Sequence, residues 1–116
     1  MKNFEVINYG ENTLVTMNNM IQMMKTLLEC DKYTYNIKFE KFSDMYVELQ
    51  CEIFNFVNLL ESHKKRKPNV FTKKDDFKIL EILKSIEGVI NGIKNNLKFD
   101  DFEYSTLHLC EWYVNM

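Results

Sequence analysis

The stretch FEKFSDMYVELQCEIFNFVNLL, residues 39–60, carries large apolar side chains alternately three and four positions apart. The residues of this row are Phe39, Phe42, Tyr46, Leu49, Ile53, Phe56 and Leu60. This spacing returns to one face of an α-helix at every turn, so the row predicts a long helix with an apolar face. We expect the helix to begin near Ser43 or slightly earlier. It should end near Arg66, because Pro68 disfavours a helical conformation in the residue before it.

Similar rows predict helices on both sides of this stretch. Residues 13–30 carry Leu14, Met17, Ile21, Met24 and Leu28, with Met20, Met23 and Leu27 beside them. Residues 72–97 carry Ile79, Ile82, Ile86, Val89 and Ile93, and Thr72 and Asp75 have the spacing of a capping box at the start. Apolar residues from Phe102 to Val114 follow Asp100 and Asp101, either of which can cap a shorter fourth helix.

Two short segments alternate between apolar and polar residues, which is the period of a β-strand. Residues 1–10 do so weakly and end at Gly10, so they are interpreted as a short N-terminal strand or an extended arm with a turn. Residues 33–38 alternate more regularly and are interpreted as a strand or an extended connection before the long helix.

The chain has 116 residues, of which 46% are hydrophobic and 14% aromatic. This is enough for one domain, residues 1–116, to close a core without a metal ion or disulfide. Helices joined by short connections are typical of an antiparallel bundle. The sequence therefore predicts a mainly α fold, a compact antiparallel bundle of about four helices.

The formal net charge is −2, so affinity for nucleic acid would have to come from a local basic patch. Neither a secretory signal nor an apolar run long enough to span a membrane is visible. Three cysteines without metal-site spacing are expected to be reduced thiols in the core. We therefore expect a cytoplasmic protein. The absence of alanine and the many lysine, asparagine and isoleucine residues indicate an A/T-rich genome, such as that of a bacterium, phage or virus.

The sequence gives little sign of catalysis or of metal chemistry. The histidines are His63 and His108, and neither has a glutamate three residues before it, as a di-iron helical bundle requires. His108 and Cys110 would lie about 200° apart on a helix, which is unsuited to binding one metal ion. A glycine-rich phosphate loop and a nucleophile elbow are also missing. We expect no cofactor and no enzyme activity.

One candidate binding surface comprises Met20 and Met23 with Gly88 and Gly92. Methionine side chains adapt to a partner's surface, and two glycines four residues apart in a helix allow another helix to approach closely. The alternative is that the methionines belong to the core and that the glycines serve packing within the bundle.

A second candidate is the basic loop of residues 63–74, with Lys64, Lys65, Arg66, Lys67, Lys73 and Lys74. Short basic runs attract phosphates and acidic protein surfaces. The alternative is that these residues complement the negative C-terminal end of the long helix.

Together these features favour a small non-enzymatic protein that acts by binding another protein, and a homodimer is one form of such binding. Inhibitors, immunity or antitoxin proteins and viral or phage host-interaction factors have this general character. The alternatives are a nucleic-acid-associated regulator that uses the basic loop and a structural subunit of a larger assembly.

Overall fold

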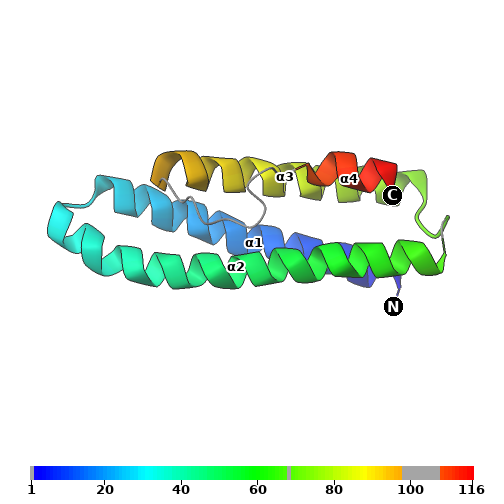
Figure 1. Ribbon diagram of the computed structural model, residues 1–116, viewed down its shortest axis with the longest axis horizontal. Helices are drawn as coiled ribbons and strands as arrows, with labels where there is room; N and C mark the ends of the chain where they lie inside the picture. Colours follow the sequence, from blue (N-terminus) through cyan, green and yellow to red (C-terminus); the bar gives the residue numbers. More distant parts are fainter. Residues whose placement is uncertain (1, 68, 98–107) are drawn as a thin grey trace.

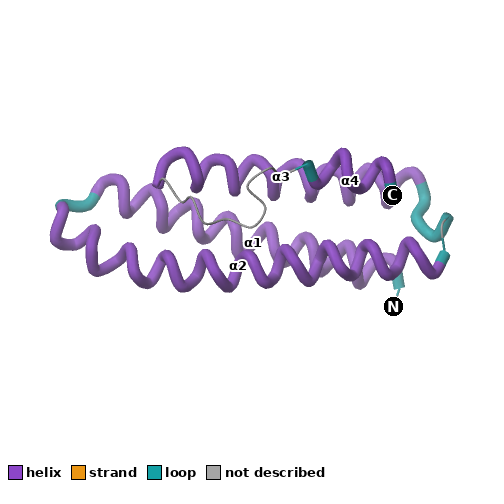
Figure 2. Tube along the Cα trace, viewed as in Figure 1, coloured by secondary structure: helices purple, strands orange, loops and turns teal. Residues whose placement is uncertain are grey.

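The computed structural model describes residues 2–67, 69–97 and 108–116. It contains four helices, α1 (Asn3–Glu29), α2 (Lys32–Arg66), α3 (Lys73–Leu97) and α4 (Leu109–Asn115), and the described residues form no strand (Figures 1 and 2). The mainly α fold predicted from the sequence, an antiparallel bundle of about four helices, is confirmed. Its dimensions are 52 × 23 × 19 Å, and α2, with 35 residues at about 1.5 Å each, spans the long axis.

Helix α1 packs against both α2 and α3, and α4 packs against α3. The three long helices run along the molecule, and both chain ends lie at the same end as the connection between α2 and α3 (Figure 1). The core contains the row predicted on α2, of which Phe42, Tyr46, Leu49, Ile53, Phe56 and Leu60 are buried. It also contains Ile79, Ile82, Leu83, Ile86, Ile90 and Ile93 of α3.

The prediction of an N-terminal strand or extended arm is wrong, because α1 begins at Asn3. The buried face of α1 follows a spacing of three and four backward from Met17 through Thr13 and Gly10 to Val6. Thr13 and Gly10 interrupt the apolar pattern there, so the helical spacing cannot be recognised from the apolar residues alone. The hydroxyl of Thr13 donates to the carbonyl oxygen of Tyr9 at 3.0 Å, so this polar group is satisfied within the core.

The strand expected over residues 33–38 is also wrong, since α2 already begins at Lys32. Asp31 caps the helix, and its carboxylate accepts from the backbone N–H of Thr34 at 2.8 Å and from the Thr34 hydroxyl at 2.9 Å. These bonds also lower the pKa of Asp31 below its ordinary value. The rings of Tyr35 and Phe39, one helical turn apart, stack with centroids 5.4 Å apart. The local cap therefore overrides the short alternating pattern.

The capping box predicted at the start of α3 is confirmed. The backbone N–H of Asp75 donates to the Thr72 hydroxyl oxygen at 3.1 Å, and the N–H of Thr72 donates to the Asp75 carboxylate at 3.2 Å. A short helix near the C-terminus is present as α4, while the expected caps Asp100 and Asp101 lie outside the described residues.

Helix α4 is held by polar contacts as well as by packing. The Tyr113 hydroxyl donates to the carboxylate of Asp76 at 2.5 Å, and burial together with this acidic neighbour raises the pKa of Tyr113. Lys64 of α2 lies 4.2 Å from the centroid of the Tyr113 ring and donates to the Tyr113 carbonyl oxygen at 3.3 Å. Tyr113 thus links α4 to both α2 and α3.

Candidate functional site: a basic cleft at one end of the bundle

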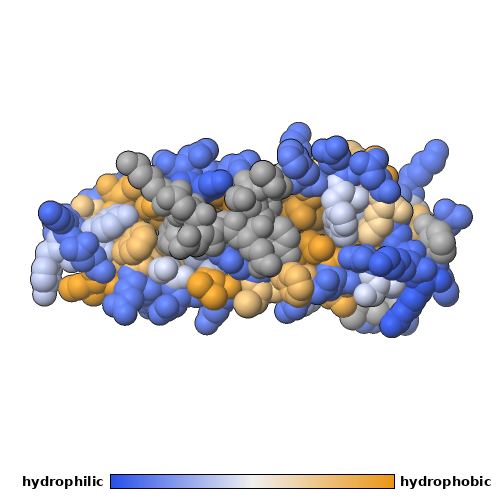
Figure 3. Space-filling view, viewed as in Figure 1, coloured by the Kyte–Doolittle hydropathy of each residue, from blue (hydrophilic) through white to orange (hydrophobic). Residues whose placement is uncertain are grey.

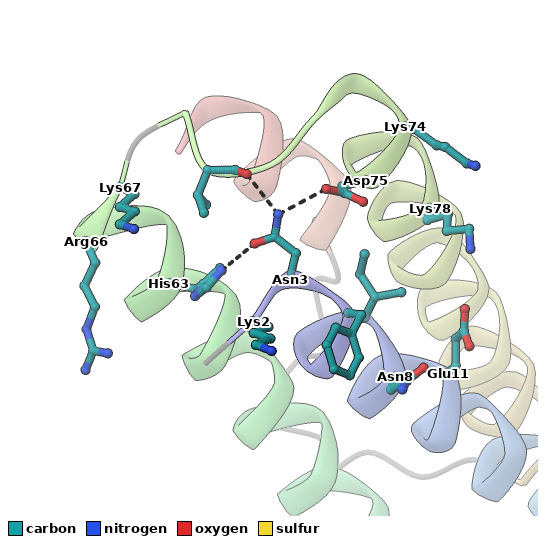
Figure 4. A pocket seen from close by; sticks show the side chains of 13 residues that line it. Lys2, Asn3, Asn8, Glu11, His63, Arg66, Lys67, Lys74, Asp75 and Lys78 are labelled. Atoms are coloured by element: carbon teal, nitrogen blue, oxygen red, sulfur yellow. Dashed lines mark hydrogen bonds between the residues drawn. The ribbon is translucent and has the colours of Figure 1, made fainter.

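A cleft of about 830 Å³ opens where the first turns of α1 and α3 meet the last turn of α2 (Figure 4). We call it the basic cleft. It is lined by Lys2, Asn3, Phe4, Ile7, Asn8, Glu11, His63, Arg66, Lys67, Val70, Lys74, Asp75 and Lys78. Residues from three separate parts of the sequence therefore form one concave surface.

The side chain of Asn3 joins the three parts. Its amide nitrogen donates to the Val70 carbonyl oxygen at 2.9 Å and to the Asp75 carboxylate at 3.2 Å. Its amide oxygen lies 2.7 Å from Nε2 of His63 (Figure 4). Since the amide oxygen can only accept, His63 must carry its proton on Nε2. One side chain at the start of α1 thus fixes the end of α2 and the start of α3.

The charge at this end of the molecule is mainly positive. Lys2, Arg66, Lys67, Lys74 and Lys78 line the cleft, against the two carboxylates of Glu11 and Asp75. In Figure 4 Arg66 and Lys67 lie on one side of Asn3, and Lys74 and Lys78 lie on the other. The N-terminal ends of α1 and α3 add the positive ends of their helix dipoles, whereas the C-terminal end of α2 adds the negative end of its own. A protein that is acidic as a whole therefore has one strongly basic end.

His63 responds to this environment. Partial burial lowers its pKa below the ordinary value of 6.5, and the nearby charges of Arg66 and Lys67 lower it further. Its ring also contacts that of Phe71, with centroids 5.2 Å apart. Neutral His63 is therefore favoured at pH 7, where it serves as a hydrogen-bond donor to Asn3.

The cleft also has an apolar part. Phe4, Ile7 and Val70 contribute to its lining, and Phe4 is 58% exposed. The ammonium group of Lys2 lies 6.0 Å from the centroid of the Phe4 ring. A ligand that combines negative charge with apolar groups would match both kinds of surface.

Of the six basic residues predicted as a binding loop, three line the cleft and three do not. Arg66, Lys67 and Lys74 line the cleft. Lys64 instead contacts Tyr113, and Lys65 forms an ion pair of 2.7 Å with Glu61 on its own helix. Lys73 is exposed and does not line the cleft.

Sequence reasoning missed Lys2, Asn3 and Lys78 as members of this site. Lys2 and Asn3 join it only because α1 extends to the start of the chain, which the interpretation of residues 1–10 as a strand concealed. Lys78 lies one helical turn after Lys74, so a capped helix starting at Lys73 would have placed both on one face. The four-residue spacing of Lys74 and Lys78 was therefore the feature of the sequence that could have identified Lys78 as a member of the site.

The other predicted surface is not formed as expected. Met20 is 0% exposed and belongs to the core, because the buried face of α1 lies about one residue away from the predicted row and includes Met20 and Leu27. Met23 is partly buried. A Cβ added at Gly88 or Gly92 would meet nothing within 4 Å among the described residues, so no described segment approaches either glycine closely. A role of these residues in binding a partner remains a prediction.

The expected position of the cysteines is wrong for Cys51, which is exposed, whereas Cys30 and Cys110 are partly buried. All three are free thiols. His108 is exposed with Nδ1 3.8 Å from the Glu111 carboxylate, and the Cys110 thiol faces the carbonyl oxygen of Leu80 at 3.8 Å. Within the described residues, no three His, Cys, Asp or Glu side chains lie close enough to hold a metal ion.

None of the described helices combines the length and the apolar character needed to cross a membrane.

Comparisons with protein-family models, with curated proteins and with solved structures gave no significant match to the chain. The geometry of the cleft is therefore the basis for any assignment of function.

Proposed function

We propose that this protein is a non-enzymatic binding protein and that its basic cleft takes an acidic segment of another protein. The observation that carries the proposal is the convergence of five cationic side chains from three parts of the chain on one cleft, in a molecule whose net charge is −2. Opposite charge on a partner would speed its association and select it against partners of like charge.

The composition of the cleft favours a protein segment over nucleic acid. Glu11 and Asp75 interrupt the positive surface, and carboxylates repel a continuous phosphate backbone. Arg66 is the chain's single arginine, so bidentate phosphate contacts are scarce. A peptide with both acidic and apolar side chains can place the former near the lysines and the latter on Phe4, Ile7 and Val70.

The wider role is an extension of this proposal. An inhibitor, an immunity or antitoxin protein, or a viral or phage host-interaction factor would each use such a surface. We place its action in the cytoplasm, where three free thiols stay reduced.

The proposal can be tested by calorimetry with a short synthetic peptide in which aspartates alternate with leucines. We expect saturable binding to the wild-type protein. Changing Lys67→Glu together with Lys74→Glu should weaken it by about tenfold or more, because each reversal near a bound carboxylate costs on the order of 1 kcal/mol. Lys67 and Lys74 are both exposed, so the helices should remain folded, as circular dichroism can verify.

The matched control is Lys25→Glu together with Lys38→Glu, which makes the same change of charge at two exposed positions that do not line the cleft. Equal loss of affinity in both double variants would show that net charge, and not the cleft, attracts the peptide.

Binding of a single-stranded DNA oligonucleotide tests the nucleic-acid alternative. If it binds with a steep dependence on salt and the peptide does not bind, the nucleic-acid alternative replaces the proposal.

A further inference from the structure

Helix α2 has a second, exposed row of side chains, directed away from the core, in which apolar residues stand on both sides of two carboxylates. We call it the outer row, and it consists of Tyr33, Ile37, Glu40, Asp44, Val47, Cys51 and Phe54, again spaced alternately four and three apart. All seven side chains are exposed. At 100° per residue they occupy an arc of about 100° that lies opposite the buried row of Phe42, Leu49 and Phe56.

This face carries a large share of the exposed apolar side chains of the described residues. Tyr33, Ile37, Val47 and Phe54 are four of the nine large hydrophobic residues that are exposed among the described residues. Apolar and hydrophilic residues adjoin one another along the edge formed by α2 in Figure 3. The apolar members of the row form two groups about 15 Å apart along the helix, Tyr33 with Ile37 and Val47 with Cys51 and Phe54, and Glu40 and Asp44 lie between them. Apolar groups on both sides of a charged centre match a face on which an amphipathic helix can pack.

The charges of the outer row have one sign. Glu40 and Asp44 lie within the row, and exposed Glu48 lies beside it. Glu48 lies about 70° from the middle of the row, and the exposed lysines Lys41 and Lys32 flank the row at about 90° on either side, so the carboxylates of Glu40 and Asp44 are the charges within the row itself. Lys65, further along, is already paired with Glu61 at 2.7 Å.

We propose that the outer row docks a basic amphipathic helix of a partner protein. Such a helix would place apolar side chains over Ile37, Val47 and Phe54, and its lysines or arginines would meet Glu40, Asp44 and Glu48.

A second copy of this chain fits the outer row less well. In parallel register it would set Asp44 against Asp44, and in an antiparallel arrangement the carboxylates would find no unpaired cation within the row. The outer row is also separate from the basic cleft, because none of its residues lines that cleft. The inference therefore goes beyond the proposed function. It gives the molecule a second binding surface, which selects a basic partner, whereas the basic cleft selects an acidic one.

The probe for this inference is a synthetic helical peptide with leucines at alternating spacings of three and four and lysines at the other positions. We expect it to bind the wild-type protein. Val47→Ser together with Phe54→Ser should weaken its binding by about tenfold or more, since two central apolar contacts are lost. A peptide with glutamates in place of the lysines should not bind, because it would face carboxylates of the same sign.

The chain offers a closely matched control. Val15 and Phe77 are 59% and 64% exposed, compared with 57% and 49% for Val47 and Phe54, and they lie on α1 and α3. Val15→Ser together with Phe77→Ser should leave the affinity within about twofold. Equal weakening in both double variants, or unchanged affinity in the Val47 and Phe54 variant, would overturn the inference.

A footprint in the wild-type protein gives a second measurement that needs no variant. Because Cys51 lies within the outer row, bound peptide should slow its alkylation by iodoacetamide several-fold while leaving the rates of Cys30 and Cys110 unchanged. If Cys51 reacts equally fast with and without saturating peptide, the inference is wrong. Sedimentation that shows dimers of the wild-type protein, dissociated by the Val47 and Phe54 changes, would instead assign the row to a second copy.

Discussion

The ring of Phe56 on α2 lies directly against the backbone of Gly10 on α1. A Cβ atom at Gly10 would lie 2.5 Å from Cζ and 2.8 Å from Cε1 of that ring, and 3.1 Å from Cγ2 of Ile82 on α3. These distances are shorter than van der Waals contact, and Phe56 is fully buried. Gly10 is therefore a point of close approach between α1 and the side chains of both neighbouring helices.

Gly10→Ala should destabilise the protein although alanine favours a helix. The gain in helix propensity is about 1 kcal/mol, whereas forcing a buried ring to move costs about 1–3 kcal/mol. We expect the free energy of unfolding, measured with urea, to fall by up to about 2 kcal/mol.

Gly88→Ala provides the opposite case within the same chain. No described atom lies within 4 Å of the added Cβ, so we expect the propensity gain of about 0.5–1 kcal/mol in stability. If Gly10→Ala stabilises the protein as much as Gly88→Ala does, the packing of α1 against Phe56 is misassigned.

Asn3→Ala should cost about 1–3 kcal/mol of unfolding free energy, because the Val70 carbonyl, the Asp75 carboxylate and His63 each lose one partly buried hydrogen bond. Asn8→Ala is the control, since Asn8 lines the same cleft but is exposed. Similar small effects for both variants in urea unfolding would show that Asn3 does not join the three segments.

Some parts of the fold and of the basic cleft could be predicted from the sequence, and others could not. The regular apolar rows of α2 and α3 predict those helices and most of the buried residues, because each row continues without a polar interruption. The first turns of α1 could not be predicted in the same way, since Gly10 and Thr13 are buried for reasons of close packing and of a local hydrogen bond. The basic loop could be predicted from its run of positive residues. That Lys2 and Lys78 lie in the same cleft could not, because it depends on how the ends of three helices meet in the fold.

Stability should depend on pH through His63. Its pKa is lowered in the folded state, so the unfolded chain takes up the proton first as the pH falls. The contribution of neutral His63 is therefore complete above the unfolded pKa of about 6.5 and is lost as the pH falls from there through the folded pKa. In His63→Gln the urea midpoint should depend less on pH below about 6.5 than in the wild-type protein. Identical slopes in the two proteins would contradict the assignment.

Tyr113→Phe should loosen α4. The change removes the hydroxyl that donates to Asp76, a bond to a charged acceptor that is worth about 1.5–3 kcal/mol. Trp112, the single tryptophan, lies next to it on α4, so its fluorescence reports on this helix. We expect an earlier fluorescence transition in urea, whereas Tyr33→Phe at an exposed position should leave the transition unchanged. An unshifted transition in Tyr113→Phe would show that the hydroxyl does not hold α4.

The central claim is that the basic cleft receives an acidic protein segment, and the most direct measurement is an NMR titration of the isotope-labelled protein with the aspartate–leucine peptide. We predict saturable shifts of backbone amide signals from residues 2–11, 63–67 and 74–78, which surround the cleft. Saturable shifts confined to other parts of the bundle, or no shifts at peptide concentrations that saturate binding in calorimetry, would contradict the claim.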